Sequence, residues 1–442
     1  MSVTLLSERF ILPVFTPVVL LTSKSRHEPG PMTQRAQPAR SKRGPGMVIR
    51  YDQPRQVFAI GPGAVCGLAD ELRVLGTRTV GLIGSRRALA SRAGDAVREQ
   101  LANVEIVAEF GAVTPHAPMT DTENIARAFA GDLPDALVAV GGGSASDTAK
   151  AVAILLAEGG SLADHCSRFI PPDRLEHVNL PAPKIPVVAV ATTLSGAEIT
   201  PGGGSTDPLG TKRVFWDPKV AARVVVLDAE LVVEAPDDLI TTTGMNGLAH
   251  CAEGLYSRTA SPISSALAVE GVRAFAAALP HVPGSTGNSR LAIVDEALRA
   301  ACLGGLVISN ARVGLHHAVC HVLGAVVGVP HGVANAVMLP YVLDFNLTET
   351  PAAADALAHA LAAGLGADAA LGAVCLTSMV QERAGVPRTL RAAGVTEDQL
   401  DEVAQGVMQD RGLYFNPRRG EDVTEVRNLL ARAFDGHLTA VA

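Results

Sequence analysis

Short apolar strands alternate with amphipathic helices through the first half of the chain, and this alternation constrains the fold more than any other feature. Strands separated by helical segments usually pair in parallel, and helices then cover both faces of the sheet. The sequence therefore predicts an α/β domain built on a parallel sheet. The predicted strands cover residues 57–60, 79–83, 104–110, 136–140, 185–191 and 222–227, and the predicted helices cover residues 64–75, 88–101, 122–130 and 148–156.

After Asp228 the sequence has helical periods and few strand candidates, which indicates a second domain that is all helical. We expect the α/β domain to cover residues 47–235 and the helical domain to cover residues 236–442. A cleft between two such domains is a common place for a ligand. The predicted helices cover residues 239–243, 246–258, 263–279, 290–307, 316–326, 333–345, 352–363, 369–384, 397–409 and 421–434.

Residues 1–46 differ in composition from the rest of the chain. The apolar stretch at 10–22 is interrupted by Pro13 and Pro17 and is shorter than the roughly 20 residues that a membrane-spanning helix needs. Residues 24–46 are rich in Pro, Arg, Lys, Gln and Gly, a composition typical of disorder. We interpret residues 1–46 as a disordered extension or as the result of a start codon assigned too early.

Composition excludes some classes of partner and compartment. The formal net charge of −7 argues against a nucleic-acid partner, since such proteins usually carry a basic surface. The six cysteines form no C-x-x-C pair, and scattered single cysteines fit a reducing cytosol better than a disulfide framework. We expect a cytoplasmic protein without a membrane partner that assembles as a homodimer.

A glycine-rich loop, GGGSASD at 141–147, follows one predicted strand and opens a helix. Glycines allow backbone N–H groups to approach a phosphate, and the positive end of the helix dipole favours negative charge there. The alternative is a tight turn in which a serine caps the helix. The order strand, loop, helix favours a pyrophosphate site, although the G-x-G-x-x-G fingerprint is absent. The candidate cofactor-binding residues of this loop are Gly142, Gly143, Ser144 and Asp147.

Two further loops follow predicted strands and carry hydroxyl groups suited to a nucleotide. The loop after 185–191 contributes Thr192, Thr193 and Ser195. The alternative is that their hydroxyl groups only stabilise turns. The loop after 79–83 contributes Gly84 and Ser85, followed by two arginines and no carboxylate. An acidic side chain at this place would repel a 2′-phosphate on a bound nucleotide, so its absence predicts that dinucleotides with and without that phosphate both bind.

Histidines concentrate in one apolar segment of the predicted helical domain. His317 and His321 stand four residues apart, so on a helix they share one face, and His331 follows ten residues later in a Pro-His-Gly turn. Asn246 and His250 form a second pair at the same spacing. A single histidine of this kind is usually packed in a core, but several that can converge on one point favour a catalytic or metal site.

These motifs resemble those of the iron-containing (group III) alcohol dehydrogenase family. In that family an Asp-x-x-x-His helix and two later histidines bind a divalent metal. Here Asn246 stands where the metal-binding members have aspartate. The pattern Gly-Met-Asn at 244–246, Ala-His at 249–250 and Glu-x-x-Tyr at 253–256 is similar to the maleylacetate reductase branch. The glycine-rich loop and the Thr-Thr-x-Ser-Gly segment at 192–196 also match the family, so the resemblance extends from about Val48 to the C-terminus.

The resemblance implies a Rossmann-like nucleotide-binding domain followed by an all-α domain, as in dehydroquinate synthase and group III alcohol dehydrogenases. It implies reduction by NADH or NADPH of the carbon–carbon double bond of maleylacetate, a small dicarboxylate, to give 3-oxoadipate. A neutral amide is a poorer ligand for Zn²⁺ or Fe²⁺ than a carboxylate, so we expect no metal. The candidate catalytic residues are Asn246, His250, His317, His321 and His331, and Lys212 and Arg213 are candidates for substrate binding.

Two other activities remain open at this stage. The chain fits a metal-dependent alcohol dehydrogenase that tolerates Asn246, and metal content would distinguish it from a metal-free reductase. It also fits a non-redox relative similar to dehydroquinate synthase, which would show no net consumption of NADH or NADPH.

Overall fold

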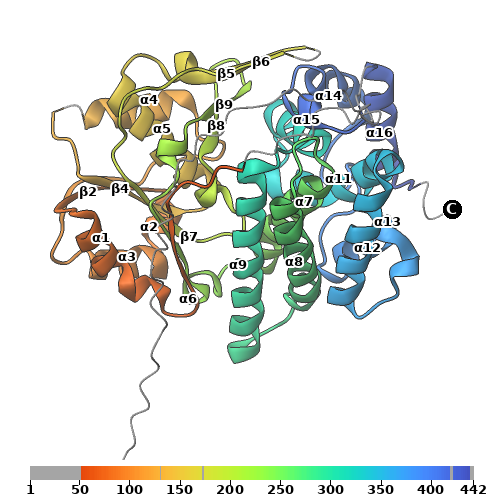
Figure 1. Cartoon of the computed structure of the whole chain (residues 1–442), viewed down its shortest axis with the longest axis horizontal. Coiled ribbons are helices and arrows are strands. Elements are labelled where there is room, and N and C mark those ends of the chain that lie inside the picture. The colour runs from red at the N-terminus through yellow and green to blue at the C-terminus, as the bar shows by residue number, and fades with distance from the viewer. Residues whose placement is uncertain (1–50, 130, 172–173, 419–421, 439–442) are drawn as a thin grey trace, which may run out of the picture. The chain divides into compact units, whose positions relative to one another are not determined.

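A computed structural model of the protein describes residues 51–129, 131–171, 174–418 and 422–438. The proposed extension at 1–46 lies outside the described residues. The ten strands of the described chain all precede Asp228, and the segments after it are helices and turns. Figure 1 shows the strands on the left of the molecule and helices α7–α16 on the right. The predicted combination of an α/β part with an all-helical part is therefore confirmed.

The main sheet has six parallel strands in the order β1-β10-β7-β4-β2-β3. Each strand lies close to a predicted one, because short runs of β-branched and apolar residues bounded by Gly or Pro are typical of buried parallel strands. The bounds are β1 (Val57–Ile60), β2 (Thr79–Gly84), β3 (Glu105–Phe110), β4 (Ala136–Gly141), β7 (Val187–Ala191) and β10 (Val224–Leu227).

Helices cover both faces of this sheet, because alternate side chains along a strand pack against different helices. In β4, Val138 joins a cluster with residues of α1 and α3, whereas Leu137 and Ala139 join a cluster with residues of α4 and α5. Successive side chains of a strand point to opposite faces, so the two clusters are the two sides of the sheet. The helices are α1 (Leu68–Leu75), α2 (Arg86–Leu89), α3 (Arg92–Gln100), α4 (Met119–Ala128), α5 (Gly143–Glu158) and α6 (Ala229–Val232).

A second, antiparallel sheet of four strands was not predicted. Its order is β6-β5-β9-β8, and its bounds are β5 (Cys166–Ile170), β6 (Arg174–Glu176), β8 (Gly202–Thr206) and β9 (Lys212–Trp216). Strand β8 reads GGGST, which has low strand propensity, so only its pairing with β9 makes it a strand. The prediction of parallel pairing alone was thus incomplete, and the missed strand β9 carries Lys212.

The helical part begins with one long helix where two short ones were predicted. Helix α7 (Asp237–Tyr256) runs without a break through Asn246 and His250. The other bounds are α8 (Pro262–Ala278), α9 (Gly287–Asn310), α10 (Leu315–Val322), a π-helix (Leu323–Val327), α11 (His331–Asn346), α12 (Pro351–Leu365), α13 (Gly372–Arg383), α14 (Leu400–Val407), α15 (Gly412–Phe415) and α16 (Val423–Asp435).

One described segment, Pro262–His281, is long and apolar enough to cross a membrane by length and composition. Half of its apolar window is buried, and α8 packs against α7, α9 and α12. Gly271, Val272 and Phe275 face this core, so the apolarity of α8 is explained by packing inside the protein.

Candidate active site

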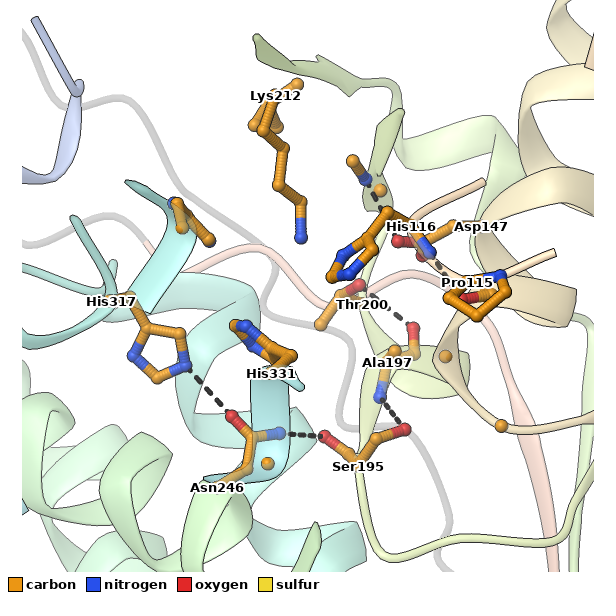
Figure 2. A pocket seen from close by; sticks show the side chains of 18 of the residues that line it. Pro115, His116, Asp147, Ser195, Ala197, Thr200, Lys212, Asn246, His317 and His331 are labelled. Carbon is orange, nitrogen blue, oxygen red and sulfur yellow. Dashed lines mark hydrogen bonds between the residues drawn. The ribbon is translucent and has the colours of Figure 1, made fainter. Parts of the chain in front are cut away.

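A cavity of about 610 Å³ lies between loops of the α/β part and helices of the helical part. Its lining on the first side includes the glycine-rich loop, and on the second side it includes the histidines of α7, α10 and α11. Figure 2 shows Asn246, His317 and His331 facing Ser195, Thr200 and His116 across this space. The expected cleft is therefore present, and it brings together the two groups of motifs.

The glycine-rich loop has the geometry of a phosphate cradle. A Cβ atom at Gly142 would lie 2.9 Å from the side chain of Thr193, and Gly141 has a φ of +148°. Helix α5 begins at Gly143, five residues earlier than predicted, so its N-terminus lies at the cavity. The positive end of this 16-residue helix favours an anion. The buried Thr193 hydroxyl has no hydrogen-bond partner among the described residues, as expected for a group that awaits a ligand.

Most of the predicted cofactor-binding residues line this cavity, but Gly84 and Thr192 lie behind it. A Cβ atom at Gly84 would lie 2.6 Å from the carbonyl oxygen of Val140, so this glycine allows close packing of two strands. Asp147 accepts a hydrogen bond from Gly204 N at 3.0 Å and so attaches β8 to α5. The predicted cofactor-binding residues that do line the cavity are Ser85, Gly142, Gly143, Ser144, Asp147, Thr193 and Ser195.

The four predicted catalytic histidines also meet at the cavity. Ring centroids lie 4.7 Å apart for His250 and His317, 5.8 Å for His317 and His331, and 5.8 Å for His321 and His331. Burial lowers the pKa of each of them. Other histidines add to this effect at His250, His317 and His331, and Lys212 adds to it at His317, His321 and His331. The cluster is therefore largely neutral, with imidazoles that can each donate and accept one hydrogen bond.

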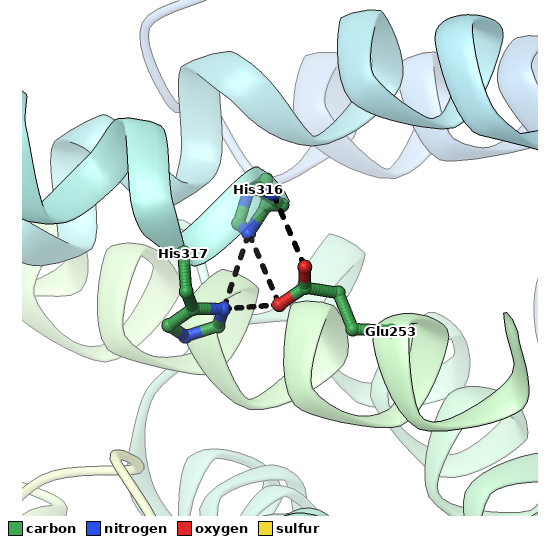
Figure 3. A group of neighbouring side chains, drawn as sticks. All are labelled: Glu253, His316 and His317. Carbon is green, nitrogen blue, oxygen red and sulfur yellow. Dashed lines mark hydrogen bonds and ion pairs between the residues drawn. The ribbon is translucent and has the colours of Figure 1, made fainter. Parts of the chain in front are cut away.

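His317 is held at both ring nitrogens, by Glu253 (Figure 3) and by Asn246 (Figure 2). Asn246 Nδ2 donates to the carbonyl oxygen of Ser195 at 3.4 Å, so Asn246 Oδ1 faces His317 Nε2, 3.1 Å away. An amide oxygen is only an acceptor, so Nε2 carries a proton. His317 Nδ1 contacts the buried carboxyl group of Glu253, whose pKa is raised by burial. Glu253 and His317 consequently share a proton. They form the buried end of a series of hydrogen bonds that runs from Ser195 through Asn246 to His317 and Glu253.

The donor set at Asn246 has a neutral amide oxygen, which binds a divalent metal less strongly than a carboxylate does. A ligating histidine presents a nitrogen lone pair to the metal and usually donates its other N–H to a carboxylate or carbonyl. His317 Nδ1 contacts the carboxyl group of Glu253 in this way, whereas its Nε2 faces Asn246 Oδ1. Within the described part of the chain, the only trio of candidate ligand atoms within 4.8 Å of one another belongs to Glu253, His316 and His317.

That second cluster is also fully engaged within the protein. Glu253 Oε1 accepts hydrogen bonds from Gly314 N at 2.8 Å and His316 N at 3.1 Å, and its other oxygen contacts His317. His316 Nε2 donates to the carbonyl oxygen of Asn335 at 3.2 Å, and burial lowers the pKa of His316 to about 4. These contacts position α10 against α7.

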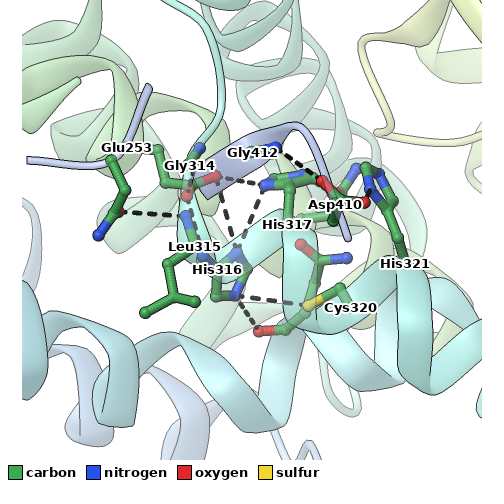
Figure 4. A network of polar contacts seen from close by, with 12 residues as sticks. Glu253, Gly314, Leu315, His316, His317, Cys320, His321, Asp410 and Gly412 are labelled. Atoms are coloured by element: carbon green, nitrogen blue, oxygen red, sulfur yellow. Dashed lines mark hydrogen bonds and ion pairs between the residues drawn. The ribbon is translucent and has the colours of Figure 1, made fainter. Parts of the chain in front are cut away.

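His321 forms a dyad with Asp410, a residue that the sequence did not indicate (Figure 4). His321 Nδ1 donates to Asp410 Oδ2 at 3.0 Å, and Gly412 N donates to Asp410 Oδ1 at 2.7 Å. Burial raises the pKa of Asp410, but the interaction with His321 and the hydrogen bond from Gly412 N outweigh burial and bring the pKa down to about 2. A carboxylate that orients an imidazole in this way leaves Nε2 free to transfer a proton.

The structure separates the two cations that the sequence placed together. Lys212 lines the cavity, and Figure 2 shows its amine directed at the space between His331 and His116. Arg213 points the other way on β9, where its Nε donates to Asp207 at 2.9 Å, and it is not part of the lining. Lys212 therefore remains the candidate for substrate binding.

His116 is a cavity residue that sequence reasoning missed. His116 and Ala117 have φ values of 66° and 47°, the only positive values outside glycine in the described chain. Such a conformation costs about 1–3 kcal/mol and persists where the surroundings fix it. Here Ser144 Oγ accepts from His116 N at 3.2 Å, and Ser205 Oγ donates to Ala117 O at 2.5 Å. The motif Pro-His-Ala-Pro at 115–118 was the available signal.

Comparison with known proteins agrees with this geometry. Residues 54–229 match the family described as iron-containing alcohol dehydrogenase, and residues 240–434 match the C-terminal part of the same family. The maleylacetate reductase of Rhizobium sp. (strain MTP-10005) is 32% identical over 385 residues, which cover 86% of this chain and 95% of that protein. The chain therefore belongs to the iron-containing alcohol dehydrogenase family.

Within that family the chain stands with the maleylacetate reductases, which confirms the resemblance drawn from the Gly-Met-Asn motif. The crystal structure of maleylacetate reductase from Agrobacterium tumefaciens matches with a TM-score of 0.73 and 28% identity, over 89% of this chain and 99% of that one. A 1,3-propanediol oxidoreductase structure matches with a TM-score of 0.79 and 28% identity, over 88% and 100%.

Proposed function

We propose that this protein is a maleylacetate reductase that uses NADH or NADPH and needs no metal. The observation that carries the proposal is the hydrogen bond between His317 Nε2 and Asn246 Oδ1, at the place where alcohol dehydrogenases of the family hold a metal. The relatives named maleylacetate reductase support it, since several of them match along most of their length. The phosphate cradle at Gly142 supports the nucleotide.

The bound nicotinamide cofactor would supply a hydride, and the residues of the cavity would supply charge stabilisation and a proton. In maleylacetate the double bond is conjugated with a ketone, so negative charge develops on the ketone oxygen. Hydrogen-bond donors directed at that oxygen lower the barrier in a site that excludes water. Lys212 and His331 face the same space and are suited to this role.

The proton for the neighbouring carbon is best assigned to His321. His317 is bonded at both nitrogens, whereas the Asp410 contact of His321 uses only Nδ1. Burial lowers the pKa of His321, Asp410 partly restores it, and the negative charge of a bound dicarboxylate would raise it further. His321 would then donate from Nε2 while Asp410 stabilises the ring and holds its orientation.

We expect purified protein to oxidise NADH when maleylacetate is added and to keep this activity in the presence of a chelator. A neutral amide and a protonated His317 Nε2 offer a metal little to bind. Elemental analysis of the same sample should show well under one equivalent of Zn or Fe. Stoichiometric metal, with activity that is lost to chelator and restored by Fe²⁺ or Zn²⁺, would favour an alcohol dehydrogenase instead.

Both coenzymes are expected to serve, with kcat/KM values within roughly a hundredfold, about 2.7 kcal/mol of discrimination. Ser85 and Arg87 line the nucleotide side of the cavity. The carboxylates in the described lining are Asp147 and Asp410, and both accept hydrogen bonds from the protein. Steady-state kinetics with each coenzyme tests this, and a preference for NADH beyond a thousandfold would contradict it.

The same proposal places the enzyme in the cytosol. All six cysteines are free, and four of them are buried. Burial raises the pKa of Cys166 and Cys302 to about 12, so these thiols stay protonated and unreactive. This use of cysteine as a small apolar residue is typical of proteins in a reducing compartment.

A further inference from the structure

Arg312 is held at the cavity by an aromatic ring. It follows α9, and its guanidinium group lies 3.4 Å from the ring centroid of Trp216 on β9. Both residues line the cavity. Stacking fixes the plane of the guanidinium group but leaves its edge, which carries the N–H donors, free for another partner.

One donor on that edge, Nη1, has no partner among the described residues. Arg312 Nη1 is buried and makes no hydrogen bond to any described residue. Burial, with the nearby charge of Arg411, lowers the pKa of Arg312 to about 9. An uncompensated buried cation is costly, so proteins rarely keep one without a function. An anion that enters the cavity would satisfy the donor and the charge together.

Arg411 connects this cation to the catalytic dyad. It also lines the cavity, it is adjacent in sequence to Asp410, and its charge affects both Arg312 and His321. Asp410 is already bonded to His321 and Gly412, so it does not neutralise both arginines. The cavity lining thus holds two guanidinium groups, and one of them, that of Arg411, is next in sequence to Asp410.

We infer that Arg312 and Arg411 form a subsite for one carboxylate of a dicarboxylate substrate, the carboxylate remote from the double bond that is reduced. The inference rests on the proposed function and extends it to substrate recognition. Lys212 influences His116, His317, His321 and His331, so it belongs to the part of the cavity where the double bond and ketone would lie. Arg312 lies against Trp216, at the other end of β9 from Lys212, which places its guanidinium group farther from the reacting carbons.

The geometry of guanidinium groups explains why this subsite would select a carboxylate. The fork of N–H donors matches the two oxygens of a carboxylate and forms parallel, charge-assisted hydrogen bonds. Trp216 holds Arg312 in one orientation before the ligand arrives, so little side-chain freedom is lost on binding. A substrate without the remote carboxylate would leave the Nη1 donor of Arg312 buried and unpaired.

The decisive comparison uses two substrates that differ only in the remote carboxylate. Maleylacetate carries it, and (Z)-4-oxopent-2-enoate has a hydrogen in its place with the same conjugated ketone. We expect Arg312→Gln to lower kcat/KM for maleylacetate by about thirtyfold and to change kcat/KM for the monocarboxylate by less than about threefold. Arg411→Gln should act in the same direction, and Arg312→Lys should give an intermediate loss.

The ratio of the two kcat/KM values is the informative quantity, since a partly unfolded variant loses activity on both substrates equally. Arg299→Gln is the matched control, because this arginine lies on α9, pairs with Asp295 and is half exposed. It should leave the ratio unchanged. An unaltered ratio in both Arg312→Gln and Arg411→Gln would overturn the proposed subsite.

A binding measurement separates this inference from the proposed reaction. If the wild-type protein failed to reduce maleylacetate, calorimetric titration of the full-length protein with adipate and with hexanoate would still test the subsite. Binding of adipate that exceeds binding of hexanoate, and that is lost in Arg312→Gln, would support the subsite alone. Equal binding of the two ligands would overturn it.

Discussion

Replacement of His321 by glutamine is expected to lower kcat by about 10²–10⁴-fold, the usual contribution of a positioned general acid. Glutamine retains polarity but cannot release a proton to carbon. The effect should fall on kcat more than on KM, because the proton is needed only after the substrate is bound. Steady-state kinetics at saturating NADH measures it. His359, an exposed histidine whose Nδ1 donates to Asp355 O, offers the control, and His359→Gln should change neither constant.

The pH profile tests the same assignment through Asp410. A general acid acts in its protonated form, so kcat/KM should fall as pH rises through the pKa of His321. Burial lowers this pKa, and Asp410 partly restores it by charge and hydrogen bond. Asp410→Asn removes the charge, so the pKa of His321 falls and the descending limb should move to lower pH by about one unit. A limb that stays in place would show that another group donates the proton.

The histidine cluster could be predicted from sequence because its spacing is local. His317 and His321 are one turn apart on α10, and Asn246 and His250 are one turn apart on α7, so helical geometry alone groups each pair. The family motif then indicated that the pairs converge. Likewise, the strands of the main sheet are short runs of Val, Ile and Ala between breakers, and each was predicted to within three residues at either end.

The other parts of the site depend on contacts between distant segments. Asp410 lies 89 positions from His321, in the turn before α15, and no local pattern distinguishes it from a surface aspartate. Arg312 acquires its role from Trp216, across the cavity lining, and the strand that carries Trp216 exists because β8 and β9 pair. His116 is recognisable only through its left-handed backbone. Contacts between segments that are distant in sequence determine the roles of Asp410, Arg312 and His116, and the periodicity of the sequence does not encode such contacts.

The substitution Asn246→Asp is expected to give the protein a metal requirement. A carboxylate at this position accepts a proton or binds a cation more strongly than an amide does, and His250, His317 and His331 surround it. Without metal, the new buried charge should lower kcat/KM for maleylacetate by about tenfold to a hundredfold, since it repels a dianionic substrate. With Zn²⁺ or Fe²⁺, the charge is compensated, and the metal should bind at about one equivalent per chain.

Thermal unfolding tests metal binding by Asn246→Asp without a measurement of activity. A ligand that binds only the folded state raises its stability by an amount that grows with ligand concentration, about 2.7 kcal/mol at one hundred times Kd. Zn²⁺ should therefore raise the Tm of Asn246→Asp and leave the Tm of the wild type and of Asn246→Ala unchanged. The alanine variant removes the same hydrogen bond to His317 without adding charge, so it separates the two effects. A Tm increase with Zn²⁺ in the wild type, equal to that of Asn246→Asp, would show that the amide already supports a metal, and the proposed metal-free chemistry would then be wrong.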